Sequence, residues 1–536
     1  MVFCTKNPES NCANTIYFSN YGTQMTGYGK TAPKKAGPWY NAVNKKPGSE
    51  WINMGKQQAF NPYLPSWEYI PDGEPHVFGD RVYVYGSHDK FNAPIFCVND
   101  YVCWSAPVED LTDWRYEGVI FRKNQDPKNR LGVRLLFAPD VCQGRDGRYY
   151  LYYAFDFMGV MGVAVCDTPS GQYQFLGHVR YPDGTVWGRR KGDQFPFDPG
   201  VLVDDDGRVW LYSGFYTPTP AVVTGFKKLK NDGGTVVELE QDMVTIKGEP
   251  RVIFPKEGPG SFPNHEFFEA SSIRKDGDKY IFVYSSRHNH ELCYAVSDRP
   301  DGGFTFGGTL VSQGDLFLDG NEDEAKALNY LGNTHGGMLK VGDQWYIFYH
   351  RQTNRHSYSR QACAEPLERT AGGGFKQAQV TSCGLNGGPL KGEGRYEARI
   401  ACNLWSKQGV GRYDCPSPRK AFEAHPYFTQ TGKDREEDGD QYIANMRDGA
   451  TAGFKYFDIG QLSAVSVELK GTAKGEFLLS ADPDFHHVAA RIPVDLHSDS
   501  YVELKSQCSL PAGKQALYWR FTGTGGVDFT AFSLLH

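Results

Sequence analysis

The sequence lacks the features that mark membrane, secreted and nucleic-acid-binding proteins. No apolar run approaches the roughly 20 residues that a membrane-spanning helix needs. The N-terminal stretch MVFCTKNPESNC has neither the basic nor the apolar region of a signal peptide. The longest basic run is GRRKG at residues 188–192, and the net charge is -6. We therefore expect a cytoplasmic protein with no membrane partner and no nucleic-acid partner.

Cysteine motifs are missing as well. The chain has 12 cysteines, but none of them form a C-x-x-C pair. This spacing argues against zinc ribbons and redox motifs, and reduced, mostly buried thiols are expected. The RHNH stretch at residues 287–290 has a His-x-His spacing, but no third ligand is evident and the stretch is interpreted as a loop.

Strand-forming residues are abundant. Aromatic residues make up 14% of the 536 residues, with 61 Gly and 31 Pro, a composition that favours strands and tight turns. One pattern, a Gly turn followed by an aromatic and β-branched strand, occurs five times. The copies are GDRVYVYGSHD (79–89), DGRYYLYYAFD (146–156), DGRVWLYSGFY (206–216), DGDKYIFVYSS (276–286) and VGDQWYIFYHR (341–351).

The spacing of these copies predicts the fold. Their turn glycines, Gly79, Gly147, Gly207, Gly277 and Gly342, are separated by steps of 68, 60, 70 and 65 residues. Each copy is the turn and second strand of a hairpin, and each step is long enough for a four-stranded sheet. The sequence therefore predicts an all-β chain that contains a five-bladed β-propeller.

A titratable residue precedes each turn by seven to nine positions. These residues are Asp72, Asp140, Asp198, Glu269 and His335. The first strand of a propeller blade lines the central axis, so these side chains are expected to converge there. Clustered carboxyl groups cannot all ionise at their usual pKa values, and such clusters are typical of acid–base sites. Glu74 falls out of this register.

With these motifs the chain resembles the family 43 glycoside hydrolases, which are inverting five-bladed propellers. The resemblance covers roughly residues 56–400 and rests on Asp72 before the first hairpin, FAPDV, FDPGVLVDDDG, FFEAS and THGG. It implies that Asp72 is the general base and Glu269 the general acid, and that Asp198 orients Glu269 and modulates its pKa. Asp72 lacks the usual following Pro, and Glu269 is followed by Ala-Ser rather than Gly-Pro.

Other site residues are predicted on weaker signals. Arg351, His88 and Trp104 are candidate sugar contacts, and Asp140 is expected to be structural. By resemblance His335 faces the axis and approaches a calcium ion or a water cluster; a hydrogen-bonded core histidine is the alternative. No cofactor is required for the chemistry, although a structural calcium ion is compatible with it.

The remaining chain predicts a second domain. Residues 371–395 are rich in Gly and suggest a boundary near residue 400, with the propeller at 56–400. Short apolar or alternating runs over residues 401–536 predict a jelly-roll-like β-sandwich. The closing LYWRFTGTGGVDFTAFSL resembles family 6 carbohydrate-binding modules. Residues 1–55 are left unassigned.

Together these features predict an inverting, exo-acting glycoside hydrolase. Its expected substrates are short xylan- or arabinan-derived oligosaccharides, from which it releases terminal pentose as a β-D-xylosidase, an α-L-arabinofuranosidase or both. Two alternatives stay open: a retaining five-bladed fructosidase and a non-catalytic sugar-binding propeller. The sequence predicts no oligomeric state.

Overall fold

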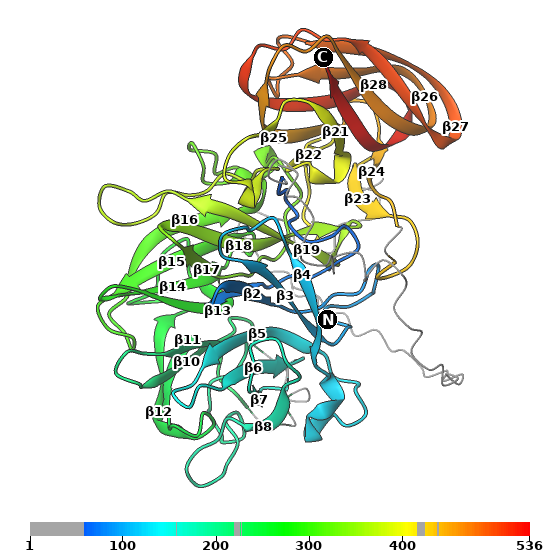
Figure 1. Cartoon of the computed structure of the whole chain (residues 1–536). Coiled ribbons are helices and arrows are strands. Elements are labelled where there is room, and N and C mark those ends of the chain that lie inside the picture. The colour runs from blue at the N-terminus through cyan, green and yellow to red at the C-terminus, as the bar shows by residue number, and fades with distance from the viewer. Residues whose placement is uncertain are drawn as a thin grey trace, which may run out of the picture.

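A computed structural model of the chain describes residues 58–536 except 157, 219–223, 225, 227, 415–423 and 437–438 (Figure 1). The unassigned segment 1–55 lies outside the described residues. The described chain consists of strands and short 3-10 helices, and none of its helices is long and apolar enough to span a membrane. The 3-10 helices are η2 (Lys123–Gln125), η3 (Pro127–Asn129), η4 (Gln313–Asp315), η5 (Glu324–Lys326), η6 (Gly384–Asn386) and η7 (Ala398–Ile400).

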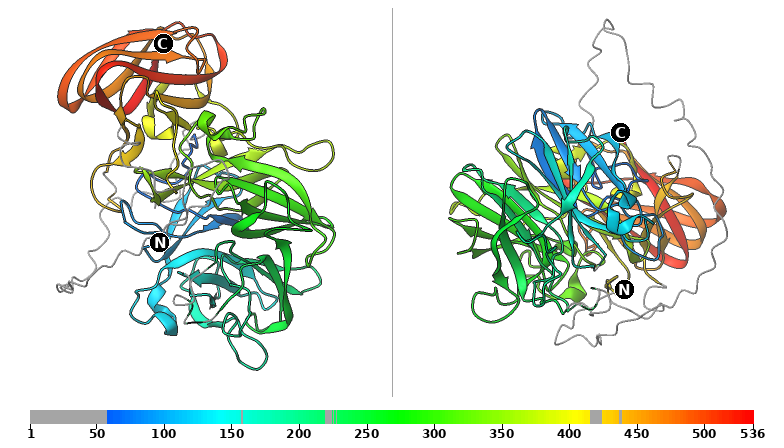
Figure 2. Two further views of the ribbon diagram at one scale, coloured as in Figure 1. Left: turned by 180° about the vertical axis from the view of Figure 1, so that it is seen from behind. Right: turned by 90° about the horizontal axis from the view of Figure 1, so that it is seen from below.

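Five consecutive antiparallel sheets form the blades of a propeller (Figures 1 and 2). Blade I contains β1 (Glu74–Phe78), β2 (Arg81–Tyr85), β3 (Tyr101–Pro107) and β4 (Arg115–Phe121). Blade II contains β5 (Leu136–Gln143), β6 (Tyr149–Phe155), β7 (Met161–Cys166) and β8 (Gln174–His178). Blade III contains β9 (Gly200–Val203), β10 (Val209–Ser213), β11 (Gly233–Leu239) and β12 (Ile246–Pro255).

The last two blades differ in strand number. Blade IV contains β13 (Phe267–Asp276), β14 (Lys279–Ser286), β15 (Glu291–Ser297) and β16 (Thr305–Ser312). Blade V has three strands, β17 (Met338–Val341), β18 (Gln344–Thr353) and β19 (His356–Leu367). The predicted all-β class and five-bladed propeller are confirmed.

The repeated glycines make the turn between the first two strands of each blade. All five have positive φ, from 58° at Gly342 to 84° at Gly207, a conformation that glycine adopts without steric cost. The strands that follow, β2, β6, β10, β14 and β18, are buried on both faces along most of their length. Each of them therefore packs inside the ring, between two neighbouring blades.

Apolar clusters between neighbouring blades hold the ring together. Leu211 of β10 and Val163 of β7 belong to the cluster between blades II and III. Val84 of β2 and Phe348 of β18 belong to the one that joins blade V to blade I. Similar clusters lie at the other three blade junctions. The ring is therefore closed by side-chain packing as well as by the backbone.

The THGG motif makes the backbone part of this closure. Gly336 pairs with Gly73 in a parallel bridge, and Gly337 donates a hydrogen bond to the Gly73 carbonyl (3.2 Å). A Cβ on Gly336 would lie 1.9 Å from the Phe348 carbonyl oxygen of β18, so a larger residue would force this segment away from β18 and disturb its bridge to Gly73.

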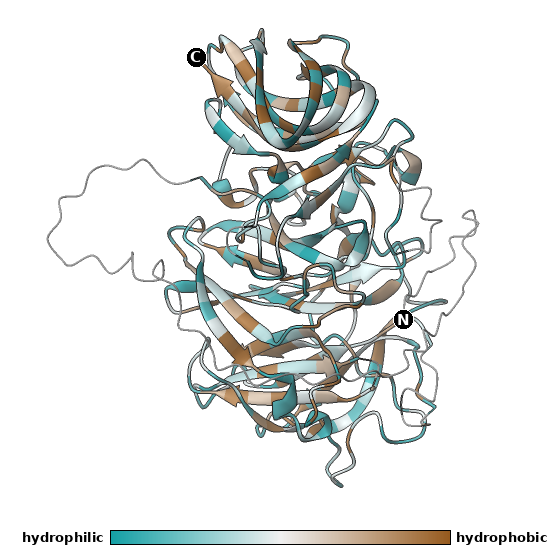
Figure 3. Ribbon diagram, turned by 90° about the vertical axis from the view of Figure 1, so that its right-hand side faces the viewer, coloured by the Kyte–Doolittle hydropathy of each residue, from teal (hydrophilic) through white to brown (hydrophobic). Residues whose placement is uncertain are grey.

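The second domain is one continuous, curled nine-stranded sheet that surrounds its own apolar core (Figure 3). Its strands are β20 (Leu390–Lys391), β21 (Gly394–Glu397), β22 (Asn403–Trp405), β23 (Tyr427–Gln430), β24 (Gln441–Met446), β25 (Thr451–Ile459), β26 (Ala464–Ser480), β27 (Ala490–Gln507) and β28 (Gly513–Leu535). Because β20 and β21 pair with β25 and β28, the boundary predicted near residue 400 falls inside this sheet.

The described cysteines are unpaired. Nine of them are free thiols, and six of these are buried. Cys4, Cys12 and Cys415 lie outside the described residues.

Candidate active site

One cavity takes its lining from all five blades and from the segment that follows β22. Four of the five residues that precede the repeated turns reach it: Asp72, Asp198, Glu269 and His335. Its other lining residues are Phe96, Phe137, Phe197, Phe215, Phe268, Asn289, Asn333, Ser357, Arg360 and Asp414. The predicted convergence of acidic residues at the meeting point of the blades is thus seen for three carboxyl groups.

The backbone is unusual where these carboxyl groups enter the cavity. Asp72 and Asp198 have φ of 58° and 48°, and Ala270, next to Glu269, has φ of 70°. The pairing of β13 with β14 is also irregular on both sides of Glu269. Left-handed non-glycine residues and bulges cost free energy, and they cluster where a side chain must be aimed at a ligand.

Asp72 is kept ionised by a buried arginine. Arg360 of β19 donates from Nη1 to Asp72 Oδ1 (2.8 Å), and His350 Nδ1 lies 3.4 Å from the same oxygen. Burial alone would raise the pKa of Asp72, but the positive charge of Arg360, with smaller effects of His350 and His335, holds it below the usual value. Asp72 is only 4% exposed, so solvent contributes little to its ionisation.

Arg360 is itself held by a second carboxylate. Its Nε and Nη2 donate to Asp89 Oδ2 (2.8 Å) and Oδ1 (3.1 Å), and its guanidinium carbon lies 4.7 Å from the centre of the Phe96 ring. A guanidinium shared between two carboxylates cannot rotate away from either one. Asp89 therefore fixes the cation that acts on Asp72.

Unlike Asp72, Glu269 favours its protonated form. Burial, followed by the negative charge of Asp72, raises the pKa of Glu269 to about 8, so this carboxyl group is protonated near neutral pH. Asp198 accepts a hydrogen bond from the backbone N–H of Ala270 (3.2 Å), next to Glu269. Burial and the nearby Glu269 also raise the pKa of Asp198 well above its usual value, since two buried carboxyl groups cannot readily ionise together.

The cavity has an aromatic wall and a polar wall. Five phenylalanines form a chain of ring contacts, from Phe96 through Phe137, Phe197 and Phe215 to Phe268, with centroid separations of 5.2 to 6.4 Å. The polar wall contains Asn289, Asn333, Ser357 and Asp414. A sugar ring has both apolar faces and hydroxyl groups, so it can pack on one wall and hydrogen-bond to the other.

His335 reaches the cavity, as predicted. Its Nδ1 lies 3.6 Å from Asp198 Oδ2, and burial lowers the pKa of His335 to about 4. Four groups of potential metal ligands occur among the described residues, and none of them includes His335. Calcium binds six to eight oxygen ligands. The described residues around His335 do not supply such a set, so they do not fit a calcium ion held by the protein alone.

Arg351 does not line the cavity, and its assignment as a sugar contact is corrected. It donates to the Ala401 carbonyl (3.0 Å) and Gln361 Oε1 (3.0 Å) and lies over the ring of Phe428 (3.9 Å). Between β18 and β19, Arg351 is paired with Gln361, and Gln352 is paired with Arg360. Successive residues of a strand face opposite sides, so Arg360 can face the cavity while Gln361 does not.

His88 and Trp104 also lie away from the cavity. His88 Nδ1 contacts the Asp100 carbonyl (2.7 Å), and its Nε2 contacts Glu68 Oε1 (3.1 Å). Trp104 Nε1 donates to Glu68 Oε2 (2.9 Å) within the core between blades V and I. Both side chains thus orient buried Glu68, and neither meets a sugar in this cavity.

Asp140 is structural. It accepts from the backbone N–H groups of Val141 and Val201 (both 2.7 Å) and contacts His76 Nε2 (2.7 Å). An irregularity in β5 between Phe137 and Asp140 explains why the register rule fails here, because Phe137 takes the place at the cavity.

Arg360, Asp89 and the phenylalanine wall were missed by sequence reasoning. A usable signal existed for Arg360, since a charged residue inside the apolar strand pattern YSRQACA needs a buried partner. No comparable signal marks Asn289 or Asp414, which lie in loops.

Comparison with known proteins identifies the family. The sequence model described as Glycosyl hydrolases family 43 matches residues 70–375. This chain belongs to family 43 of the glycosyl hydrolases. A xylosidase/arabinosidase of Thermoclostridium stercorarium is 48% identical over 89% of this chain and 99% of that protein. Xylosidase/arabinosidase 43A of Humicola insolens is 30% identical over 53% of this chain and 88% of that protein.

A solved structure of the family also aligns with the chain. The family 43 arabinoxylan arabinofuranohydrolase of Bacillus subtilis is 20% identical and covers 89% of this chain and 97% of that chain, with a TM-score of 0.46. Membership of the family rests on the sequence matches, and it makes this family 43 chain a glycoside hydrolase.

Proposed function

We propose that this family 43 enzyme removes terminal pentose units from short oligosaccharides with inversion at the anomeric carbon. One observation carries the proposal. A carboxylate with a lowered pKa, Asp72, and a carboxyl group with a pKa of about 8, Glu269, face the same cavity. Carboxyl groups whose environments separate their pKa values in this way divide the base and acid roles between them.

The two groups supply the chemistry of an inverting hydrolase. Ionised Asp72 accepts a proton from water as the water oxygen bonds to the anomeric carbon. Protonated Glu269 donates its proton to the glycosidic oxygen as the bond to the leaving group breaks. Inverting enzymes keep the two carboxyl groups about 6.5–9.5 Å apart to leave room for the water. Asp198, through the Ala270 N–H, is the positioning residue for Glu269.

The pentose assignment and the exo mode rest on different support. The relatives in Thermoclostridium stercorarium and Humicola insolens are named xylosidase/arabinosidase, which supports activity on xylose, arabinofuranose or both. The cavity is walled by five blades and by Asp414 from beyond β22, which supports a pocket that accepts a chain end. Hydrolysis by two carboxyl groups and water needs no cofactor.

Two further expectations belong to this proposal. We propose a cytoplasmic location, which agrees with short substrates rather than polymers. The second domain is proposed to resemble a carbohydrate-binding module in fold. Whether that domain binds sugar is tested by the number of xylan oligosaccharides that a Glu269→Gln variant binds per chain. Such a variant retains one substrate in the cavity without cleaving it. A second bound oligosaccharide per chain would indicate a site in the second domain.

The test is hydrolysis of nitrophenyl β-D-xylopyranoside and nitrophenyl α-L-arabinofuranoside, with the product anomer followed by NMR. Inversion on either substrate supports the proposal. Retention would favour the fructosidase-type alternative, in which the carboxyl groups lie about 5–5.5 Å apart. Binding of xylo-oligosaccharides without hydrolysis would favour the non-catalytic alternative.

A further inference from the structure

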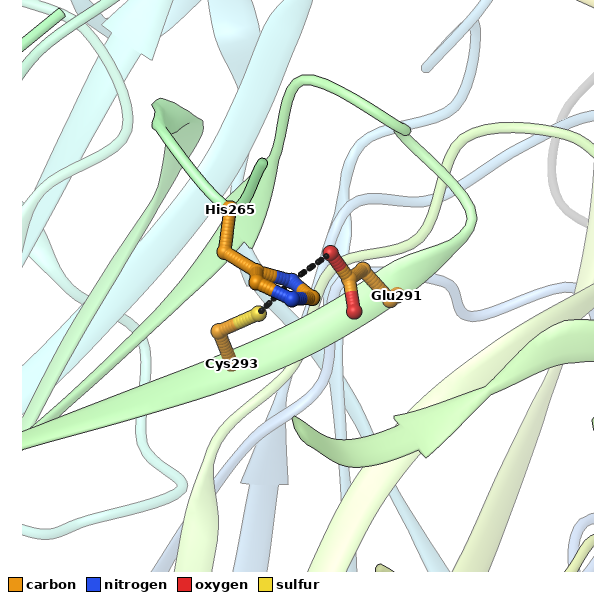
Figure 4. Close-up of side chains that lie close together, drawn as sticks. All are labelled: His265, Glu291 and Cys293. Carbon is orange, nitrogen blue, oxygen red and sulfur yellow. Dashed lines mark hydrogen bonds and ion pairs between the residues drawn. The ribbon is translucent and has the colours of Figure 1, made fainter. Parts of the chain in front are cut away.

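Three potential metal ligands meet at one end of blade IV, outside the catalytic cavity (Figure 4). His265 lies two residues before β13, while Glu291 and Cys293 are the first and third residues of β15. Because they are two positions apart on a strand, Glu291 and Cys293 point to the same side. His265 Nδ1 lies 2.8 Å from Glu291 Oε1 and 3.8 Å from Cys293 Sγ.

The carboxylate of this cluster is buried and fixed. Glu291 is 0% exposed. Ser286 Oγ donates to Glu291 Oε1 (2.5 Å), and Thr309 Oγ1 donates to Oε2 (2.8 Å). Hydrogen bonds of this kind orient the carboxylate ligands of metal sites.

The histidine is held from the other side. Tyr284 Oη donates to the His265 carbonyl (2.7 Å), and the His265 ring stacks on Phe306 at 4.8 Å. The His265 side chain is 21% exposed, whereas Glu291 and Cys293 are buried. The cluster is thus open to solvent only on the histidine side, which leaves a path for an ion and room for a water ligand.

We propose that His265 Nδ1, a Glu291 carboxylate oxygen and Cys293 Sγ form a binding site for a zinc-class divalent metal ion. Zinc binds these three ligand types in tetrahedral geometry, with bonds of about 2.0–2.3 Å. Ligand atoms in such a tetrahedron lie about 3.4 Å apart for N and O and about 3.6 Å apart for N and S. The observed N–S separation of 3.8 Å is close to its expected value, whereas the N–O separation of 2.8 Å is that of a hydrogen bond and must lengthen by about 0.6 Å when an ion enters.

Charge balance also fits a divalent ion. Binding releases the Cys293 thiol proton and the His265 Nδ1 proton to solvent, and the ion takes the place between the ligand atoms. The thiolate and the carboxylate then neutralise the 2+ charge, so the buried site carries no net charge. Thiolate and imidazole ligands select transition metals of the zinc class over calcium, which requires oxygen ligands.

A neighbouring cluster fits less well. His288 and His290, of the RHNH stretch, lie near Glu324. However, Glu324 accepts a hydrogen bond from Arg412 (2.8 Å), whose positive charge opposes a bound cation. The cluster of Asp482, Asp484 and His486 is largely exposed and has no thiol. Only the His265 cluster, among those found in the described residues, contains a cysteine.

The site would connect two parts of blade IV. A bound ion would tie the loop before β13 to β15. His265, in that loop, lies four residues before Glu269 in the sequence. We therefore expect a metal-dependent rise in thermal stability. This inference is independent of the proposed substrate.

The test uses Co²⁺ as the probe, added to the full-length protein under reducing conditions. A cobalt–thiolate site gives a near-ultraviolet charge-transfer absorption that sites with only histidine and carboxylate ligands do not give. We expect this absorption to saturate at one Co²⁺ per chain and to be displaced by Zn²⁺. Zn²⁺ should also raise the melting temperature of the wild type.

Variants assign the absorption to this cluster. Cys293→Ser and His265→Ala should each lose the thiolate absorption and weaken Co²⁺ binding by at least tenfold. His265 is partly exposed, so His265→Ala should fold even if Cys293→Ser does not. Cys166→Ser and His486→Ala are matched controls and should keep the thiolate absorption. Absence of the absorption in the wild type, or its persistence in both cluster variants, would overturn the proposal.

Discussion

The ionisation of Asp72 depends on one buried cation, Arg360. Both residues are less than 6% exposed at their side chains, and water screens such a pair poorly. Asp89 completes the group by holding the other edge of the guanidinium. Three residues from two distant segments of the chain therefore determine the state of the proposed base.

Replacing Asp72 by Asn tests its role as the base. The side chain keeps its size but cannot take a proton from water, so we expect kcat to fall by about 10²- to 10⁴-fold with a smaller change in KM. The measurement is nitrophenol release from whichever pentoside the wild type cleaves. Asp205→Asn is a matched control, because the Asp205 side chain is 86% exposed and lies outside the cavity. Equal loss in both variants would contradict the assignment.

Replacing Glu269 by Gln tests the acid. Wild-type activity should fall as the pH rises through about 8, because Glu269 must be protonated to act and its pKa is about 8. In the Gln variant this basic limb should disappear. The loss should be greatest for substrates with poor leaving groups, since good leaving groups depart without a proton. A uniform loss across leaving groups, with the basic limb retained, would rule out this role.

Arg360→Lys tests the electrostatic coupling. Lysine cannot span both carboxylates as the planar guanidinium does, so the pKa of Asp72 should rise toward its usual value. Because Asp72 acts ionised, activity at low pH should fall, and the acid limb should move upward by about one pH unit. Arg351→Lys is the control and should leave the acid limb in place. An unmoved acid limb in Arg360→Lys would show that another group fixes Asp72.

The same pair of arginines shows how far the sequence predicts single residues. Composition and register identified Asp72, Asp198, Glu269 and His335, because one rule, a titratable residue before each turn, applies to all of them. The choice between Arg351 and Arg360 depends on which face of blade V meets the axis. That face is set by the pairing of β18 with β19, which the sequence does not show.

At the scale of elements, one arginine joins three blades near the axis. Arg274 of β13 donates to the Met338 carbonyl at β17 (2.6 Å), to Glu74 Oε2 (2.7 Å) and to the Pro75 carbonyl of β1 (3.0 Å). Glu74 is 0% exposed, and burial raises its pKa to about 8 even with Arg274 beside it. Glu74, which had no place in the sequence register, is thus a structural partner of this contact.

Arg274→Met should therefore destabilise the propeller. Methionine keeps much of the apolar stem but removes every donor, so the Met338 and Pro75 carbonyls and Glu74 each lose a buried hydrogen bond, and Glu74 keeps only Ser272. Because Glu74 is largely protonated at neutral pH, the loss is that of hydrogen bonds, about 1–3 kcal/mol for each buried acceptor left without a donor. The measurement is the free energy of unfolding in urea. Arg208→Met provides the contrast, because its pair with Asp206 is exposed and should contribute about 0–1 kcal/mol. Similar values for the two variants would refute this account.

The elements themselves were predictable because their signals are local. A turn glycine with positive φ needs no distant partner, so the five hairpins and their period could be read directly. The strand β20 is only two residues long and pairs with β25, more than 60 residues later. A short strand of this kind has no period to detect, so the sequence does not show that it pairs within the second sheet.

At the scale of the whole molecule, the second domain reaches into the propeller at buried ion pairs. Arg435, from the segment between β23 and β24, donates to both oxygens of Glu68 (2.6 and 2.7 Å) and lies beside His88. Lys455 of β25 pairs with Asp315 at 2.7 Å, and both are nearly fully buried. Asp414, beyond β22, adds its carboxylate to the cavity wall, where it accepts a hydrogen bond from Asn289 Nδ2 (3.0 Å).

Through these contacts the second domain helps to form the cavity and the core beside it. A single sequence does not show such contacts. Glu68 and Arg435 are 367 residues apart, and neither belongs to a recognisable motif. The sequence could indicate two domains because each has its own strand pattern. It could not indicate that His88 and Trp104 serve their junction, since that requires the position of Arg435.

Arg435→Met tests the junction. Removing Arg435 leaves Glu68 buried with His88, Trp104 and the Tyr69 N–H as its remaining partners, so we expect unfolding to become less cooperative and the free energy of unfolding at pH 7 to fall by about 3–5 kcal/mol. Calorimetry measures both effects. Lys433→Met, on the same segment, is the control, because its side chain has no ion pair among the described residues.

The pH dependence of this variant separates the charge pair from simple packing. Despite burial, His88 and Arg435 lower the pKa of Glu68 to about 2 in the folded protein, against an ordinary value of 4.5. A carboxyl group with a lowered pKa stabilises the fold above its unfolded pKa, and that stability is lost as the pH falls from about 4.5 toward 2. Removing Arg435 raises the pKa of folded Glu68, so the difference in stability between wild type and variant should shrink across this range. A difference that stays constant down to pH 2 would mean that Arg435 acts through the packing of its guanidinium over Trp67 and Tyr116, and not through its pairing with Glu68.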